Sequence, residues 1–311
     1  MTQAIRTLMA SLIDYAGLFP PAKLAMGPAA EAFARSQRGE DSWVLARFIC
    51  PASRLAELSK AAAAMMPGTF ATSGYREQAE VTEPWRVSAI IDGALEKDLE
   101  AIAGFNSHHE REDHGLAAVD AIEMKVTGPA QIDDAIELIP DEVFPFFEFG
   151  VSGDCRGMVA ALAGHAAGAK IRTGGVTAEA FPAPEQVAAF IVACAGAEVP
   201  FKATAGLHHP IRAEYPLTYE PGCPRGTMHG FLNLFVASAF VQAQRIDARR
   251  AAEVLEERDA STFKFTDEGV RWKGLFAETA QIAKAREVLS LSYGSCSFDE
   301  PVGEMKALGL M

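Results

Sequence analysis

Two lysines at the ends of apolar runs are the residues of this sequence best suited to chemistry. Lys170 opens the segment Lys-Ile-Arg-Thr-Gly-Gly, and Lys202 opens Lys-Ala-Thr-Ala-Gly. A lysine amine condenses with a carbonyl group to form a Schiff base when the amine is neutral. A second cation nearby favours the neutral form, so we expect Lys170 to be the nucleophile and Lys202 to promote loss of its proton.

Two glutamates lie in similar apolar surroundings. Glu123 is part of Ala-Ile-Glu-Met-Lys-Val, and Glu148 is part of Phe-Phe-Glu-Phe-Gly. Charged groups in such runs are costly unless they are paired. Positioned carboxylates can also transfer protons. We therefore predict that Glu123 or Glu148 moves protons for Lys170, with a purely structural set of Lys–Glu ion pairs as the alternative.

The residues after each lysine could hold an anion. The guanidinium of Arg172 could bind a carboxylate or phosphate as a two-pronged donor, although it could instead pair with Glu148 or Glu123. Glycine-rich turns can present backbone N–H groups to an anion, or can simply end a strand. The predicted substrate-binding residues are Arg172, Thr173, Gly174, Gly175, Thr204, Gly206, His208 and His209.

The adjacent histidines allow several roles. On an extended segment His208 and His209 face opposite ways, so at most one of them enters a common site. That histidine could act in acid–base catalysis or stabilise the loop. Together with His229 and a carboxylate such as Glu148 or Asp92, the pair could also bind a metal. The spacing matches no known ligand pattern, so we predict neither a metal nor a cofactor.

The chain alternates short apolar runs with amphipathic segments of 10 to 15 residues, a pattern typical of βαβ units and a parallel sheet. We predict an α/β fold of the (β/α)8 TIM type, not necessarily regular, in which the carboxyl ends of the strands carry the site. The predicted strands cover residues 43–50, 86–92, 118–126, 143–149, 169–173, 200–205 and 289–293.

Two regions depart from this alternation. Residues 207–229 predict a long irregular loop, followed by helices at 230–244 and 247–258, a hairpin at 262–274 and a helix at 278–288. We expect a single domain over residues 1–311, elaborated by an insertion at about 207–280. Near the start of the chain, Asp14 and Tyr15 lie in an apolar run, where they either line a pocket or, in the case of Asp14, cap a helix.

Residues 118–209 resemble the last third of deoxyribose-phosphate aldolase, a class I aldolase family. That family has a Lys-Thr-Ser-Thr-Gly strand end and, about thirty residues later, a Lys-Ala-Ser-Gly-Gly strand end. Lys170 matches the Schiff-base lysine and Lys202 the lysine that perturbs it, while Glu123 falls where the family has an acidic proton shuttle. The resemblance implies a barrel with aldolase activity. Arg172 and the His-His-Pro segment after residue 207 depart from the family pattern.

Composition limits the partners. Lys plus Arg is 28 and Asp plus Glu is 41, so the formal net charge is −13. This excess of acidic groups argues against nucleic acid and anionic membranes as partners. Five scattered cysteines without a CxxC pair fit a reducing cytoplasm, and no signal peptide is evident. We expect a small anionic molecule as the partner. The sequence leaves open whether the chain forms a homo-oligomer.

These features predict an aldolase-like lyase that uses a lysine Schiff base on a small anionic carbonyl compound. One alternative is a metal-dependent barrel enzyme that uses His208, His209 and His229. Another is a barrel that binds an anion without catalysis. A phosphoribosyltransferase with a lysine-lined barrel is a further enzyme alternative.

Overall fold

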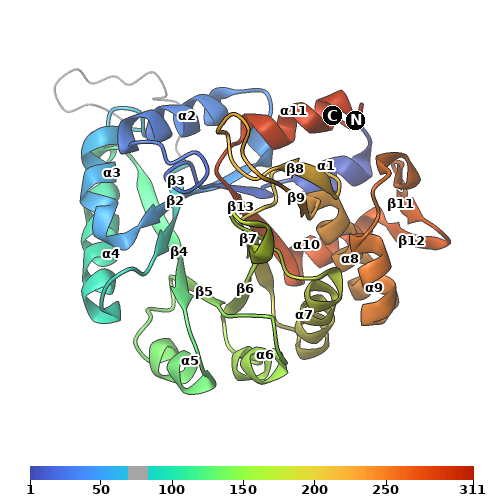
Figure 1. Cartoon of the computed structure of the whole chain (residues 1–311). Helices are drawn as coiled ribbons and strands as arrows, with labels where there is room; N and C mark the ends of the chain where they lie inside the picture. The colour runs from blue at the N-terminus through green and yellow to red at the C-terminus, as the bar shows by residue number, and fades with distance from the viewer. Residues whose placement is uncertain (69–82) are drawn as a thin grey trace.

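Eight parallel strands close into a barrel in the computed structural model, which describes residues 1–68 and 83–311 (Figure 1). The order around the barrel is β1-β13-β7-β6-β5-β4-β3-β2. The predicted (β/α)8 fold is therefore confirmed. The barrel strands are β1 (Ile13–Tyr15), β2 (Leu45–Pro51), β3 (Trp85–Ile90), β4 (Ala117–Lys125), β5 (Phe144–Glu148), β6 (Gly168–Arg172), β7 (Phe201–Thr204) and β13 (Ser290–Ser295).

Helices surround the barrel on its outer side (Figure 1). They are α1 (Gln3–Met9), α2 (Met26–Arg38), α3 (Leu55–Ala62), α4 (Leu95–His109), α5 (Pro129–Ile136), α6 (Arg156–Leu162), α7 (Pro184–Ala197), α8 (Phe231–Gln244), α9 (Ala248–Leu255), α10 (Thr279–Val288) and α11 (Asp299–Ala307). Short 3₁₀ helices are η1 (Ser42–Val44), η2 (Ala52–Arg54), η3 (Glu112–His114), η4 (Ala178–Ala180) and η5 (Ala260–Thr262).

Strand β6 shows how the sequence alternation positions the site. Successive side chains of a strand point to opposite faces. Ala169 and Ile171 belong to the hydrophobic core, whereas Lys170 makes ion pairs with residues of β4 and β5. The apolar face of β6 therefore packs outward, and its charged face points into the barrel.

The first barrel strand was not predicted. Strand β1 has three residues, too few for an alternating pattern to stand out, and Asp14 interrupts the apolar run around it. Its pairing with β13 on one side and β2 on the other closes the sheet. Asp14 thus lies in a strand and does not cap a helix.

The segment between β7 and β13 contains more regular structure than we predicted. Instead of an irregular loop, residues 207–229 include a hairpin of β8 (Ala213–Pro216) and β9 (Arg225–Met228). The predicted hairpin at 262–274 is a sheet of three strands, β10 (Lys264–Phe265), β11 (Gly269–Trp272) and β12 (Leu275–Glu278).

One helical stretch, Ala178–Ala197, is long and apolar enough to cross a membrane by length and composition alone. It contains α7, which contacts α6, α8 and α9. Buried side chains such as Val187, Phe190 and Ile191 account for its apolar character. In this fold α7 is one of the helices around the barrel.

The Arg286 side chain joins the two strands that complete the barrel. Its guanidinium donates to backbone carbonyls in the last turn of α1, in the residues just before β1 and at the start of β13. The acceptors are the carbonyl oxygens of Leu8, Ala10, Ser11, Ser290 and Leu291. Carbonyls that lose such a donor away from water destabilise the fold. Arg286 therefore holds the N-terminal segment against β13.

We expect Arg286→Met to lower the free energy of unfolding by about 3 kcal/mol, because several partly buried carbonyls lose their donor. Denaturant titration of the full chain measures this change. Arg249→Met, at an exposed arginine, is the matched control and should change the free energy by less than about 0.5 kcal/mol. Equal stability of the two variants would contradict the closing role of Arg286.

Candidate active site

Lys170 and Glu148 belong to a buried cluster of charged side chains inside the barrel. They form its upper part, which is the part nearer the carboxyl ends of the strands. The Lys170 Nζ lies 2.7 Å from Glu123 Oε2 and 2.6 Å from Glu148 Oε2. All three side chains are less than a tenth exposed. Lys170 thus lies between the two carboxylates, and because Lys202 also contacts Glu123, the structure brings together all four residues that the sequence indicated as catalytic.

Lys202 and Asp14 form the lower part of the same cluster. The Lys202 Nζ lies 2.6 Å from both Asp14 Oδ2 and Glu123 Oε1. Glu123 therefore bridges the two lysines, one oxygen to each. The Lys202 side chain is fully buried, and its register position on β7 is directly beside Lys170 on β6. We use the name charge cluster for Asp14, Glu123, Glu148, Lys170 and Lys202.

The charge cluster favours the ionised form of its two glutamates. Burial alone would raise the pKa of Glu123, but the ammonium groups of Lys170 and Lys202 hold it well below its usual range. Burial likewise opposes ionisation of Glu148, and Lys170 and Arg172 outweigh it, so the pKa of Glu148 is lowered. Burial would lower the pKa of Lys202, yet Asp14 and Glu123 raise it. The lower part of the cluster is therefore a fixed ion pair.

Lys170 faces a cavity of about 550 Å³ that opens at the carboxyl ends of the strands, whereas Lys202 lies beneath it and does not line it. Apolar side chains form much of the wall, and charged groups lie at the floor and rim. The lining includes Phe19, Ile49, Ile90, Ile91, Asp92, Glu123, Met124, Lys125, Glu148, Lys170, Arg172, Gly175, Val176, Thr204, Gly206, His208 and Cys296. An apolar cleft with a few convergent polar groups is the usual form of a small-molecule site.

Arg172 lies at the rim of the cavity. Its side chain is 49% exposed, and its Nε lies 3.4 Å from Glu148 Oε1. The contact is long for a hydrogen bond, so the guanidinium keeps most of its donors for an incoming anion. Gly175, Thr204 and Gly206 line the cavity beside it, as a substrate-binding role requires.

Thr173 and Gly174 have another place in the structure. The Thr173 hydroxyl is buried and donates to the carbonyl oxygen of Ala205 at 2.7 Å, which ties the loop after β6 to the loop after β7. The same two loops touch at Gly174 and Gly206, where a Cβ on Gly206 would lie 2.9 Å from the Gly174 Cα. Gly206 also has a φ of +71°. Thr173 and Gly174 therefore shape the rim but do not line the cavity, whereas Gly206 does both.

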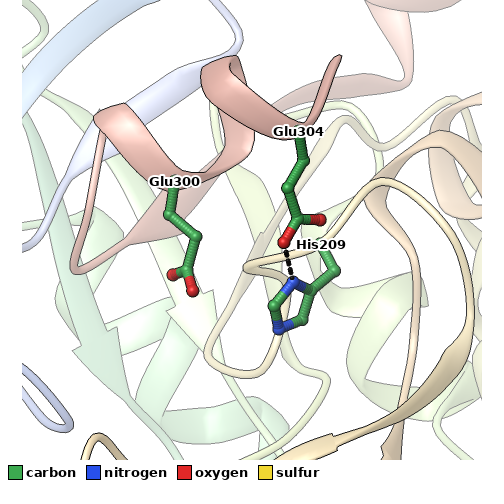
Figure 2. Close-up of side chains that lie close together, drawn as sticks. All are labelled: His209, Glu300 and Glu304. Carbon is green, nitrogen blue, oxygen red and sulfur yellow. Dashed lines mark hydrogen bonds and ion pairs between the residues drawn. The ribbon is translucent and has the colours of Figure 1, made fainter. Parts of the chain in front are cut away.

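The three histidines of the metal hypothesis do not converge. His208 lines the cavity, with its Nδ1 3.8 Å from Cys296 Sγ. His209 does not line this cavity, and its Nδ1 lies 2.7 Å from Glu304 Oε1 on α11 (Figure 2). His229 lies apart from both, because its Nε2 donates to the Pro182 carbonyl and its Nδ1 accepts from Arg212. His208 and His209 both border a second cavity and both lie near glutamates of α11, so the prediction that they face opposite ways is wrong.

Two kinds of site residue were missed from the sequence. Asp14 was noticed as a carboxylate in an apolar run but was not connected with Lys202, 188 residues away. Two serines were overlooked, namely Ser88, which donates to Glu123 Oε1, and Ser292, which donates to Asp14 Oδ2. A serine within a strand has no charge to mark it, so only the position of Asp14 carried a readable signal.

No family model, no curated protein and no solved structure matches this chain. The comparisons therefore lend no support to the resemblance to deoxyribose-phosphate aldolase. What the structure bears out of that resemblance is the closed parallel barrel.

We expect Asp14→Asn to lower the free energy of unfolding by about 3–5 kcal/mol, because it leaves Lys202 with a carboxylate that Lys170 also shares. Asp134→Asn, on the exposed face of α5, is the matched control. Chemical denaturation of both variants measures the difference. A loss below about 1 kcal/mol at Asp14 would show that the buried pair is not needed.

Two buried histidines give the protein a defined stability profile below neutral pH. Burial, together with the charge of Arg212, lowers the pKa of His229 to about 4, and burial together with His209 lowers that of His208 to about 4. Unfolded histidine titrates near 6.5, so between these values the unfolded chain binds one more proton at each position. Stability contributed by the neutral imidazoles is therefore complete above about pH 6.5 and is lost as the pH falls toward 4.

We expect each histidine to contribute a slope of about 1.4 kcal/mol per pH unit in this window. His229→Gln keeps a donor for Pro182 and an acceptor for Arg212 and should reduce the slope by that amount. Unfolding free energies at several pH values between 4 and 6.5 test it, with exposed His165→Gln as the control. An unchanged slope in His229→Gln would mean that His229 titrates normally.

Proposed function

We propose that this chain is a lyase of the aldolase type that forms a Schiff base between Lys170 and a small, anionic carbonyl compound. One observation carries the proposal: Lys170 is the amine at the floor of the cavity, and two carboxylates that could receive its proton contact it. Lys202, which has no access to the cavity, supplies a fixed positive charge on the far side of Glu123.

The proton must leave Lys170 before the amine can attack. The charge cluster together with Arg172 contains three positive and three negative groups. A proton moved from Lys170 to Glu148 neutralises one group of each sign, so the remaining charges are still balanced. Such a transfer creates no unbalanced buried charge, which would be costly. Glu148 is the favoured acceptor, because Glu123 is held between two ammonium groups.

An anionic substrate would help this transfer. Arg172 contacts Glu148 and is one of the cations that lower the pKa of that carboxyl. When the substrate anion pairs with the exposed guanidinium, it draws positive charge away from Glu148. The carboxylate becomes a stronger base at the moment that the carbonyl group reaches Lys170. Binding of the anion and activation of the amine are thereby coupled.

The reaction then follows from the chemistry of the iminium ion. The neutral Lys170 Nζ adds to the carbonyl carbon, and the carbonyl oxygen leaves as water after taking up two protons. In the cleavage direction a carboxylate removes the proton of the β-hydroxyl, the Cα–Cβ bond breaks, and its electron pair flows to the iminium nitrogen to form an enamine. Protonation of the enamine carbon and hydrolysis release the second product and restore the amine.

Borohydride trapping tests the proposal. We expect incubation with short aldehydes and 2-ketoacids, followed by reduction, to add one adduct mass per chain at Lys170, located by peptide mass. Lys170→Arg keeps a cation between the carboxylates but cannot form the imine, so this adduct should be lost. Lys284→Met, at an exposed lysine of α10, is the control that should trap normally.

An adduct at Lys202 in place of Lys170 would contradict the assigned roles. A folded wild-type protein that gives no adduct at either lysine, yet binds anions through Arg172, would replace the lyase proposal with the anion-binding barrel. A carbonyl panel that includes phosphorylated aldehydes makes this outcome decisive.

A further inference from the structure

The second candidate centre of this molecule lies outside the charge cluster, between the loop after β7 and the C-terminal helix α11. His209 comes from the loop, and Glu300 and Glu304 come from α11, where residues four apart share one face (Figure 2). One donor atom from each of the three lies within 4.8 Å of the other two. Within the described residues, the ion pairs of these glutamates are with histidines alone.

The imidazole of His209 is held in a fixed orientation. The Tyr215 ring stacks on it with a centroid distance of 3.5 Å and an interplanar angle of 11°. The Tyr215 hydroxyl donates to the carbonyl oxygen of Ile211, which anchors that ring in turn. His209 Nδ1 thereby points at α11 and lies 2.7 Å from Glu304 Oε1. This stacking limits rotation of the ring, so the nitrogen that faces α11 keeps its direction.

The carboxylates are placed and still adjustable. Glu300 Oε2 accepts a hydrogen bond from the Tyr219 hydroxyl at 3.0 Å and lies 3.6 Å from His208 Nδ1. The side chains of Glu300 and Glu304 are 28% and 37% exposed, so both can rotate. A tetrahedral ion with bonds of about 2.1 Å needs donor atoms about 3.4 Å apart. Small movements of the two glutamates around a stationary His209 reach that spacing.

We infer that His209, Glu300 and Glu304 form a binding site for a divalent metal ion, with Zn²⁺ as the ion of best fit. One imidazole nitrogen and two carboxylate oxygens suit zinc, whereas calcium and magnesium prefer oxygen ligands alone. Three protein ligands leave a fourth position for water or a ligand. Two of the three proposed ligands, His209 and Glu300, line a cavity of about 470 Å³ together with Tyr219 and His208.

The site would connect the metal with the cavity of Lys170. His208 borders both cavities and is the direct neighbour of His209. An ion at His209 would fix the loop after β7 to α11 and so hold His208 in place above the charge cluster. This inference does not depend on the Schiff base, since none of its three ligands belongs to the charge cluster.

Zinc titration of the full chain, free of any tag and treated with a chelator, tests the site. We expect calorimetry with ZnCl2 to give one ion per chain and a raised thermal midpoint, because a ligand that binds only the folded state stabilises it. His209→Ala and Glu304→Gln should each weaken binding by about tenfold or more. His165→Ala and Glu287→Gln, at exposed positions, are the matched controls and should bind as the wild type does.

Glu304→Gln changes a partly exposed side chain, so this variant stays informative even where His209→Ala unfolds. Absence of one-to-one binding in the wild-type protein would overturn the inference. Binding that is equally strong in Glu304→Gln and in the wild type would also overturn it, since the ion would then sit elsewhere on the acidic surface.

Discussion

The barrel interior depends on one shared carboxylate, Glu123, whose two oxygens contact two buried ammonium groups. Isolated charges in such surroundings would be strongly unfavourable, and removing one partner of a buried pair leaves the other uncompensated. Register fixes the arrangement: Glu148 pairs in register with Lys170, and Lys170 with Lys202, on three neighbouring strands. Glu123, one strand further along, reaches both lysines. Parallel pairing of β4 to β7 is therefore what assembles the charges.

The charge cluster has one part that is fully buried and another part that borders the cavity. Lys202 and Asp14 are fully buried and join strands 188 residues apart in the chain, so this pair contributes to closing the barrel. Lys170, Glu148 and Arg172 border the cavity, and their contacts can be exchanged for contacts with a substrate. In our proposal the lower pair supplies fixed charge and the upper groups supply chemistry. Stability and proposed reactivity thus share Glu123.

Much of the barrel could be read from the sequence because the apolar runs of β2 to β7 are bounded by helices with clear starts, such as Pro129 and Pro184 at the first turns of α5 and α7. The positions of Lys170, Lys202, Glu123 and Glu148 followed from charged residues in those runs. Strand β1 was not predicted, because three residues are too few to show an alternating pattern. It is a strand because it pairs with β13, which is distant in sequence. The role of Asp14 and the orientation of His209 toward α11 also depend on contacts between residues that are distant in sequence.

The central claim is that Lys170 is the accessible amine of the charge cluster and that Lys202 is sealed from the cavity. Reductive methylation of the native protein tests this claim most directly. Formaldehyde is the smallest carbonyl compound, and cyanoborohydride fixes the imine that it forms with a neutral amine. Peptide mass analysis over time gives the rate at each lysine. The account predicts that Lys170 is methylated in the folded protein and is protected by a bound anion, while Lys202 is methylated only after unfolding. Methylation of Lys202 before Lys170, or protection of both in the folded protein, would contradict it.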